Sequence, residues 1–218
     1  MPNNPFFVKI ILKGRCLLME QLIHAIKTAL TNYKDTKPFV IAIDGLSGAG
    51  KTTISKRITN TFANSITFHI DDYIVTRKHR YHTGIDQWKE YYFLQWEIET
   101  LKRDFFQNLK DGKNVTLPFY LQKEDTHQMV TTPIQNTDII IIEGIFLQRD
   151  EWKDYYDFII YMDCPREIRD KRVLNRDKYI GNMDERLEKY KTRYWPAEDY
   201  YLSHVSPQQH ADFVFINS

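Results

Sequence analysis

The run "GLSGAGKT", Gly45 to Thr52, combines glycines, a lysine and a hydroxyl at the spacing GxxxxGK[ST]. Glycines let the backbone turn tightly and point successive N–H groups at phosphate oxygens, and the N-terminal end of a following helix adds a favourable dipole. Lys51 would supply a mobile positive charge for the β- and γ-phosphates, and Thr52 would offer its hydroxyl to Mg²⁺. The pattern predicts a site for a nucleoside triphosphate and leaves the reaction open.

The alternative is a glycine-rich turn that only joins a strand to a helix. The context argues against it, because the apolar run "FVIAI" (39–43) precedes the loop, a helix-compatible segment follows it, and a second threonine comes directly after the motif. The predicted nucleotide-binding residues are Gly45, Leu46, Ser47, Gly48, Ala49, Gly50, Lys51, Thr52 and Thr53.

Two classes of nucleotide-binding protein are disfavoured by the rest of the sequence. A guanine-specific GTPase would carry an NKxD or TKxD motif, which is absent here. A motor or AAA-type ATPase would end its second strand in an Asp-Glu pair, whereas the run "DIIIIEG" ends in Glu143 and Gly144. What remains is phosphoryl transfer to a small acceptor, which needs a carboxylate near the attacking hydroxyl, a metal site and cations.

Carboxylates follow two of the apolar runs. Asp71 and Asp72 come at the end of "SITFHI" (65–70), and Glu143 ends "DIIIIEG" (138–144). Because ligands of open α/β sheets bind at the carboxyl ends of strands, we predict that Asp71 is a general base. Asp72 would be a neighbouring carboxylate that contacts the substrate or lies beside the metal. Thr52, Asp71 and Glu143 are the predicted Mg²⁺ ligands. The alternatives are turn or helix-cap chemistry for the aspartates and an exposed strand end for the glutamate.

Arg166, Arg169, Arg172 and Arg176 recur at spacings of three, three and four, which predicts one face of a helix. Arginine forks suit phosphate oxygens, and such a helix could close over the nucleotide as a lid that excludes water. A solvated face paired with neighbouring acidic residues is the commoner use of such a stripe. Only two of the four arginines are therefore assigned to function.

The region from 73 to 135 is polar and aromatic, and its segment "LPFYLQKEDTHQ" reads as a loop rather than an element of the central sheet. A long excursion between sheet strands usually carries recognition, so we expect it to cover the acceptor site. Tyr120 could stack on a ring and His127 could form a hydrogen bond; Asp72, Tyr73 and Arg80 complete the predicted substrate contacts. Core packing of Tyr120 and an ordinary exposed basic loop around Arg80 are the alternatives.

The apolar runs, continued by "FIIYMD" (158–163) and "DFVFI" (212–216), are rich in β-branched residues, as are strands of a parallel sheet covered on both faces. Helical stretches at 55–62, 95–110 and 166–177 alternate with them, and an amphipathic helix over 18–33 precedes them. The predicted fold is α/β, a P-loop NTPase-type three-layer sandwich with a mostly parallel central sheet.

Composition excludes several other classes. The 218 residues suit one domain, and 30 basic against 29 acidic residues give no sign of nucleic acid or an anionic membrane as a partner. Cys16 and Cys164 lie in no disulfide or zinc pattern, which favours a reducing cytosol and a cytoplasmic protein. No run approaches the ~20 apolar residues of a membrane span, the N-terminus lacks the features of a signal peptide, and Met19 could be an alternative start.

In order along the chain, "IAIDGLSGAGKTT", "HIDDYI", "IIIIEGIFL", "RVLNRD" and "ADFVFIN" resemble the motifs of the uridine kinase-like P-loop kinases, whose relatives act on nicotinamide riboside, pantothenate and ribulose phosphate. The resemblance covers 38–217 and implies transfer of a phosphoryl group from ATP, with Mg²⁺, to a hydroxyl. It implies Asp71 as the base, Lys51 and Thr52 on phosphate and metal, and Arg172 and Arg176 in the lid. Residues 1–37 would be an extension with a helix, and 38–218 a kinase domain with an acceptor-site insertion (about 73–135) and a lid (about 166–182).

The sequence differs from that family in the segments that recognise the nucleoside. "HRYHTGIDQWKEYY" stands in place of an Asp-His-Pro-type segment, Tyr120 is followed by Leu121 rather than Asp, and an Arg-Gly-Arg-Asp pattern is missing after Asp177. A nucleoside such as uridine or cytidine is the favoured acceptor. A regulatory nucleotide-binding protein without efficient transfer, and a kinase acting on another small alcohol or a macromolecule, are the alternatives. The N-terminal helix could serve a homo-oligomer as readily as it packs on its own domain.

Overall fold

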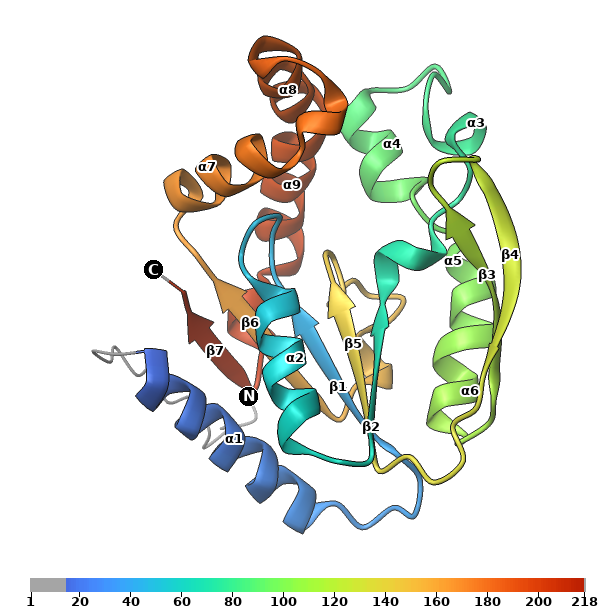
Figure 1. Ribbon diagram of the computed structural model, residues 1–218, viewed down its shortest axis with the longest axis vertical. Coiled ribbons are helices and arrows are strands. Elements are labelled where there is room, and N and C mark those ends of the chain that lie inside the picture. Colours follow the sequence, from blue (N-terminus) through green and yellow to red (C-terminus); the bar gives the residue numbers. More distant parts are fainter. Residues whose placement is uncertain (1–14, 218) are drawn as a thin grey trace.

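Five parallel strands form the central sheet of the computed structural model, which describes residues 15–217 (Figure 1). Their order is β2-β5-β1-β6-β7. The strands are β1 (Phe39–Asp44), β2 (Ser65–His69), β5 (Ile139–Gly144), β6 (Phe158–Asp163) and β7 (Phe213–Ile216). The five apolar runs are therefore strands, and the predicted α/β fold class is confirmed. The first fourteen residues of the predicted N-terminal extension lie outside the described residues.

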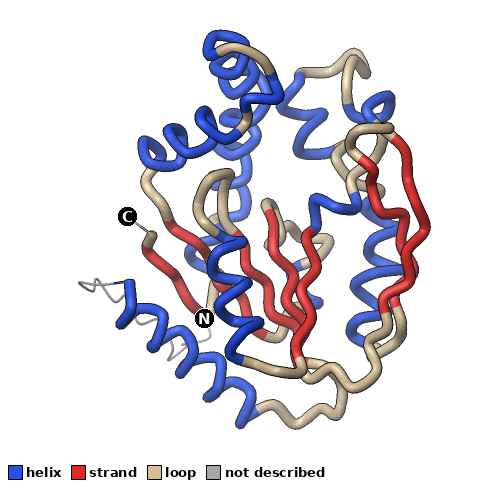
Figure 2. The backbone as a smooth tube through the Cα atoms, in the orientation of Figure 1, coloured by secondary structure: helices blue, strands red, loops and turns tan. Residues whose placement is uncertain are grey.

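Helices connect and cover these strands, as Figure 2 shows. The α-helices are α1 (Arg15–Asn32), α2 (Lys51–Thr61), α3 (Arg77–Arg80), α4 (Gln87–Phe93), α5 (Ile98–Leu101), α6 (Gln107–Lys110), α7 (Arg166–Arg176), α8 (Met183–Lys189), α9 (Trp195–Val205) and α10 (Pro207–His210). Short 3₁₀ turns are η1 (Ile70–Tyr73), η3 (Lys153–Tyr155) and η4 (Lys178–Ile180), and π-helical turns are η2 (Lys102–Phe106) and η5 (Tyr190–Tyr194).

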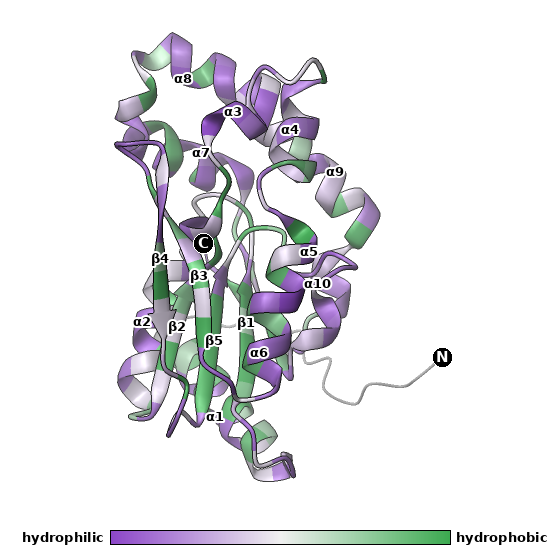
Figure 3. Ribbon diagram, turned by 90° about the vertical axis from the view of Figure 1, so that its right-hand side faces the viewer, coloured by the Kyte–Doolittle hydropathy of each residue, from purple (hydrophilic) through white to green (hydrophobic). Residues whose placement is uncertain are grey.

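The sheet is buried on both faces because successive strand residues point to opposite sides. On β1, Ile41 and Ile43 pack in one core with α1 and α2, while Val40 and Ala42 pack in a second core with the α5–η2–α6 segment and α9. In Figure 3 the central strands are hydrophobic over most of their length, whereas much of the region around α3 and α8 is hydrophilic. Burial on both faces explains why the strands are continuous apolar runs rather than alternating ones.

The segment "LPFYLQKEDTHQ" is part of a β-hairpin, so its prediction as a loop was wrong. β3 (Val115–Leu121) pairs antiparallel with β4 (Thr126–Thr132) in a separate two-stranded sheet, drawn apart from the central strands in Figure 2. Asp125, with φ 53°, ends the turn between them. β4 is almost wholly exposed, so only β3 carries an apolar alternation that a sequence could show.

Two helix boundaries also differ from the predictions. α2 begins at Lys51 rather than near 55, because Gly50, with φ 99°, ends the turn and the helix starts at once. The stretch predicted as one helix over 95–110 starts at Ile98 and contains the π-helical turn η2. α1 packs on its own domain through Leu18, Leu22 and Ile26.

A buried carboxylate ties α9 to the end of β1. Asp44 is fully buried; its Oδ2 accepts hydrogen bonds from the Tyr201 hydroxyl (2.5 Å) and Gln148 Nε2 (2.9 Å). The same hydroxyl accepts the backbone N–H of Gln148 at 3.0 Å. Burial raises the pKa of Asp44. The contact fixes the strand end from which the glycine-rich loop departs.

We expect Tyr201→Phe to lower the free energy of unfolding by about 1–3 kcal/mol, because it removes a donor to Asp44 and leaves the Gln148 N–H without its acceptor. Urea denaturation measures the change. Tyr200→Phe is the matched control, since the Tyr200 hydroxyl forms no hydrogen bond with any described residue. Equal midpoints for the two variants would contradict a stabilising role for this contact.

Candidate active site

The glycine-rich loop has the backbone that a phosphate cradle requires. Gly48 and Gly50 have φ values of 76° and 99°, in the left-handed region that favours glycine. A Cβ at Gly48 would lie 2.9 Å from the carbonyl oxygen of Arg169, and one at Gly45 would lie 2.8 Å from the Cβ of Met162. The loop therefore needs glycine both for its turn and for its close packing, and it leads directly into α2.

The side chains at the start of α2 meet the end of β5. Lys51 Nζ donates to the carbonyl oxygens of Gly45 (2.8 Å) and Leu46 (3.2 Å), and the Thr52 hydroxyl donates to Glu143 Oε1 (2.9 Å). The register of the parallel strands produces this contact, because Glu143 on β5 pairs with Ile43 on β1. The predicted phosphate and metal residues are thus adjacent.

His69 also contacts Glu143, which the sequence analysis missed. Its Nδ1 lies 2.5 Å from Glu143 Oε1, because His69 is the register partner of Glu143 in the neighbouring strand β2. Burial raises the pKa of Glu143, but the hydrogen bond from His69, the charge of Lys51 and the Thr52 hydroxyl together outweigh it and lower that pKa. Glu143 is therefore an ionised carboxylate. The hydrogen bond to Glu143 raises the pKa of His69.

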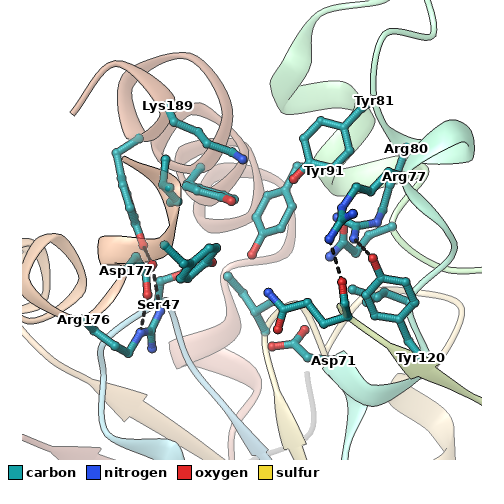
Figure 4. A pocket seen from close by; sticks show the side chains of 18 of the residues that line it. Ser47, Asp71, Arg77, Arg80, Tyr81, Tyr91, Tyr120, Arg176, Asp177 and Lys189 are labelled. Carbon is teal, nitrogen blue, oxygen red and sulfur yellow. Dashed lines mark hydrogen bonds and ion pairs between the residues drawn. The ribbon is translucent and has the colours of Figure 1, made fainter. Parts of the chain in front are cut away.

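Asp71 and Asp72 follow β2 in the turn η1, and both line a cavity of about 840 Å³. The side chain of Asp71 is exposed to the space of this cavity (Figure 4). Desolvation inside the cavity raises the pKa of Asp71; Lys51 opposes the shift, and Glu143 and Asp72 reinforce it. A carboxylate with a raised pKa facing a cavity is suited to take a proton.

The donor set fits Mg²⁺. This ion usually takes one or two carboxylates together with water and substrate phosphate oxygens, rather than an all-protein cage. Glu143 and Thr52 are in contact, and among the residues from 15 to 217 no group of three or more His, Cys, Asp or Glu is arranged to hold a metal alone.

The four arginines of α7 have different environments. Arg172 Nη1 donates to the carbonyl oxygen of Gly48 (3.1 Å), and Arg176 lines the cavity and pairs with Asp177 (2.6 Å). Arg169 is buried in an ion pair with Glu198, and Arg166 pairs with Asp199 at the surface. Arg169 Nη1 also donates to the carbonyl oxygen of Ser47 (3.3 Å), so Arg169 and Arg172 both contact the phosphate loop, and Arg176 alone of the four lines the cavity.

The acceptor-side predictions divide into two groups. Asp72, Arg80 and Tyr120 line the cavity, and the Tyr120 hydroxyl accepts from Arg80 Nη2 (3.2 Å) and donates to Asp125 (2.8 Å). Tyr73 and His127 lie outside the cavity wall. The ring of Tyr73 packs on Phe105 and Phe119, and His127 Nε2 hydrogen-bonds to the carbonyl oxygen of Ile74.

The opposite wall comes from residues outside the predicted set of substrate contacts. They lie on the loop after α3, on α4 and on the segment from η4 to η5, and their shared feature is a high density of tyrosine. The members are Tyr81, Tyr91, Tyr179, Lys189, Tyr190 and Tyr194. These segments lie far apart in the sequence and meet where α4 packs against η5 and α8 against η4 and η5, so spacing alone could not have found them.

Residues 40–217 match the model of the phosphoribulokinase and uridine kinase family. The chain belongs to that family. The resemblance predicted from the sequence motifs is therefore confirmed, and the protein is a P-loop kinase of small molecules.

Individual relatives agree with this family assignment. Uridine kinase of Staphylococcus aureus strain JH9 is 30% identical over 182 residues, which cover 80% of this chain and 86% of that protein. A structure described as a possible uridine kinase from Bacillus stearothermophilus is 39% identical, covers 89% of this chain and 99% of its own, and superposes with a TM-score of 0.73. A D-glycerate 3-kinase from Cryptococcus neoformans shares the fold alone, at 12% identity and a TM-score of 0.68 over 94% of this chain and 96% of its own.

Within residues 15–217, no helix has the length and apolar character needed to cross a membrane.

We expect Thr52→Val to raise the Mg²⁺ concentration needed for half-maximal activity by on the order of tenfold or more, because it removes a hydroxyl that contacts the carboxylate of Glu143. Thr52→Ser keeps the hydroxyl and serves as the control. The measurement is a Mg²⁺ titration of ATP turnover at fixed ATP, and an unchanged titration for the valine variant would remove Thr52 from the metal site.

Proposed function

We propose that this kinase transfers the γ-phosphoryl group of ATP, with Mg²⁺, to a hydroxyl of a small metabolite, and that a nucleoside such as uridine or cytidine is the first acceptor to test. The observation that carries the proposal is the shared cavity. Lys51, Asp71 and Arg176 line one space of about 840 Å³, so the phosphate loop, a base and a lid cation face the same volume. That volume lies within the range of small-molecule sites.

The proposed step is an in-line displacement. The acceptor oxygen forms a bond to the γ-phosphorus, the bond from that phosphorus to the β-γ bridging oxygen breaks, and ADP leaves. Asp71 takes or orients the hydroxyl proton, which its raised pKa favours. Mg²⁺, when bound through Thr52 and Glu143, neutralises charge on the phosphate oxygens.

The remaining residues hold the reacting groups. Backbone N–H groups of the glycine-rich loop and the ammonium of Lys51 would bind the β- and γ-phosphates. Lys51 has no acidic partner among the described residues and contacts only the carbonyl oxygens of Gly45 and Leu46, so its charge is available to the nucleotide. Arg176 and Arg172 would screen charge that develops during transfer and help the lid exclude water.

Support for a nucleoside comes from two directions. The S. aureus relative is named uridine kinase, and the cavity wall carries tyrosine rings on which a base could stack.

The regulatory alternative predicts ATP binding without release of ADP on addition of an acceptor. The macromolecular alternative predicts an extended basic surface, which the near-balanced composition does not favour.

The test is ADP release from ATP and Mg²⁺ with a panel of uridine, cytidine, other nucleosides, nicotinamide riboside and pantothenate, with Lys51→Ala as the blank. Acceptor-dependent release that the blank lacks supports the proposal. If no acceptor stimulates ADP release while ATP still binds, the result would favour the regulatory alternative.

Asp71→Asn should lower kcat by about 10²–10⁴-fold while leaving ATP affinity within a few fold, because the amide cannot accept the proton but occupies the same volume. Asp72→Asn is the neighbouring control and should lose less, since both carboxylates line the cavity but Asp71 is the proposed base. Steady-state kinetics and nucleotide titration measure the two effects. Full turnover by Asp71→Asn would exclude this residue as the base.

A further inference from the structure

Besides Lys51 of the phosphate loop, four cations line the cavity without an ion-pair partner among the described residues. They are Arg77, Lys78 and Arg80 from α3 and Lys189 from the end of α8. Within the described residues none of the four forms an ion pair, whereas Arg176, which also lines the cavity, is paired with Asp177. Charged residues of the same sign that converge without a counter-charge repel one another, so their convergence indicates a missing anion.

Arg80 is the clearest case because its side chain is only 6% exposed. Nε donates to the carbonyl oxygen of Val75 and Nη2 to the hydroxyl of Tyr120, and both partners are neutral. The nearest acid in this network is Asp125, which accepts from the Tyr120 hydroxyl and from the backbone N–H of Arg77. Desolvation raises the pKa of Asp125, but the backbone N–H of Arg77, the Tyr120 hydroxyl and the charges of Arg77 and Arg80 outweigh it and lower that pKa. This carboxylate therefore compensates part of the charge of the two arginines, and a ligand anion would compensate the rest.

Tyr81 reports the field that these cations create. Lys189 Nζ and Arg80 Cζ each lie 5.0 Å from its ring centroid, and Arg193 Cζ lies 4.0 Å from it. Burial raises the pKa of Tyr81, but the charges of Arg193, Lys189 and Arg80 outweigh it and lower that pKa. Arg193 is paired with Glu90 at 2.9 Å, so the cations beside Tyr81 that form no ion pair among the described residues are Lys189 and Arg80.

Arg77 and Arg80 lie across the cavity from the phosphate loop, and Lys189 points toward the ring of Tyr81 (Figure 4). In Figure 4, Arg77, Arg80 and Tyr120 are on one side of the cavity and Ser47, Arg176 and Asp177 are on the other, with Asp71 at the floor between them. The three acidic residues of the wall, Asp71, Asp72 and Asp177, come from the phosphate side or the floor. The phosphates of ATP belong at the loop, which leaves the unpaired cations to the acceptor.

We propose that the acceptor carries an acidic group, a carboxylate or a phosphate, which Lys78, Lys189 and Arg77 bind at the end of the cavity opposite the phosphate loop. The inference rests on the proposed kinase function and narrows its acceptor from any small alcohol to an acidic one. A neutral nucleoside would leave these cations uncompensated. A nucleoside with an acidic substituent, an acidic sugar and a sugar phosphate all meet the requirement, because Lys and Arg bind either anion by charge-assisted hydrogen bonds.

Matched pairs of acceptors test the proposal: glycerol with D-glycerate, ribose with ribose 5-phosphate, and uridine with its 6-carboxylate. Binding to the wild-type protein with ADP and Mg²⁺ is measured by calorimetry, and turnover by ADP release from ATP. At least one acidic member should bind on the order of tenfold or more tightly than its neutral partner, and the pair that responds tells carboxylate from phosphate. The affinity should weaken as salt rises.

The two proposals fail differently. Equal or tighter binding of the neutral member in every pair overturns the acidic acceptor, and turnover of neutral uridine would then leave the kinase function intact. Preferential binding of an acidic member without ADP release supports the anion site and counts against the kinase function.

Lys78→Gln supplies a second test, because Lys78 is exposed and its replacement leaves the packing unchanged. The KM of the acidic acceptor should rise tenfold or more, while the KM of ATP and the affinity of the neutral partner stay the same; Lys78→Arg should retain the wild-type preference. Lys89→Gln is the matched control, since Lys89 pairs with Asp86 and does not line the cavity. Equal losses for acidic and neutral acceptors would assign Lys78 a structural role and overturn the proposal.

Discussion

The parallel register of β1, β5 and β2 is the constraint on which the site depends. It sets Glu143 beside Ile43 on one side and His69 on the other, so that the glycine-rich loop, the metal carboxylate and the turn carrying Asp71 leave the sheet at the same edge. A shift of one residue would turn every side chain of a strand to the opposite face. Because both faces are buried in separate apolar cores, that shift is strongly opposed.

The segment from α8 through η5 to α9 links the two ends of the cavity. At one end Lys189 and Arg193 contact the ring of Tyr81, and at the other Glu198 accepts the backbone N–H of Ser47 in the phosphate loop. The π-helical turn η5 lies between these contacts and supplies cavity-lining tyrosines. Such turns are frequent at functional sites, where they redirect side chains without ending a helix. One helical segment therefore positions side chains at both ends of the cavity.

Two arginines buried outside the cavity wall, Arg169 and Arg193, have carboxylate partners, Glu198 and Glu90, whereas the buried Arg186 donates to the carbonyl oxygen of Gly181. The cations that line the cavity are left unpaired, with the exception of Arg176. Removing charge from water costs free energy unless a partner compensates it, so an unpaired cation in a cavity marks a place where a ligand is expected to supply the partner.

The sequence by itself determined the elements whose physics is local. The strands could be predicted because burial on both faces leaves a continuous apolar run, and the phosphate loop because positive φ angles at Gly48 and Gly50 demand glycine in a fixed spacing. Asp71 and Glu143 were found because each ends such a run. These features covered the central sheet and the phosphate half of the candidate site.

Only the tertiary structure decided the rest. The contact of His69 with Glu143 depends on strand order, which a single sequence does not contain. The β3–β4 hairpin was missed because β4 is exposed and shows no apolar alternation. The acceptor wall joins Arg80 to Lys189 across more than a hundred residues, and their lack of acidic partners is a property of the packed chain rather than of any motif. Which charged side chains have a partner therefore depends on how distant segments pack, and the sequence alone could not give it.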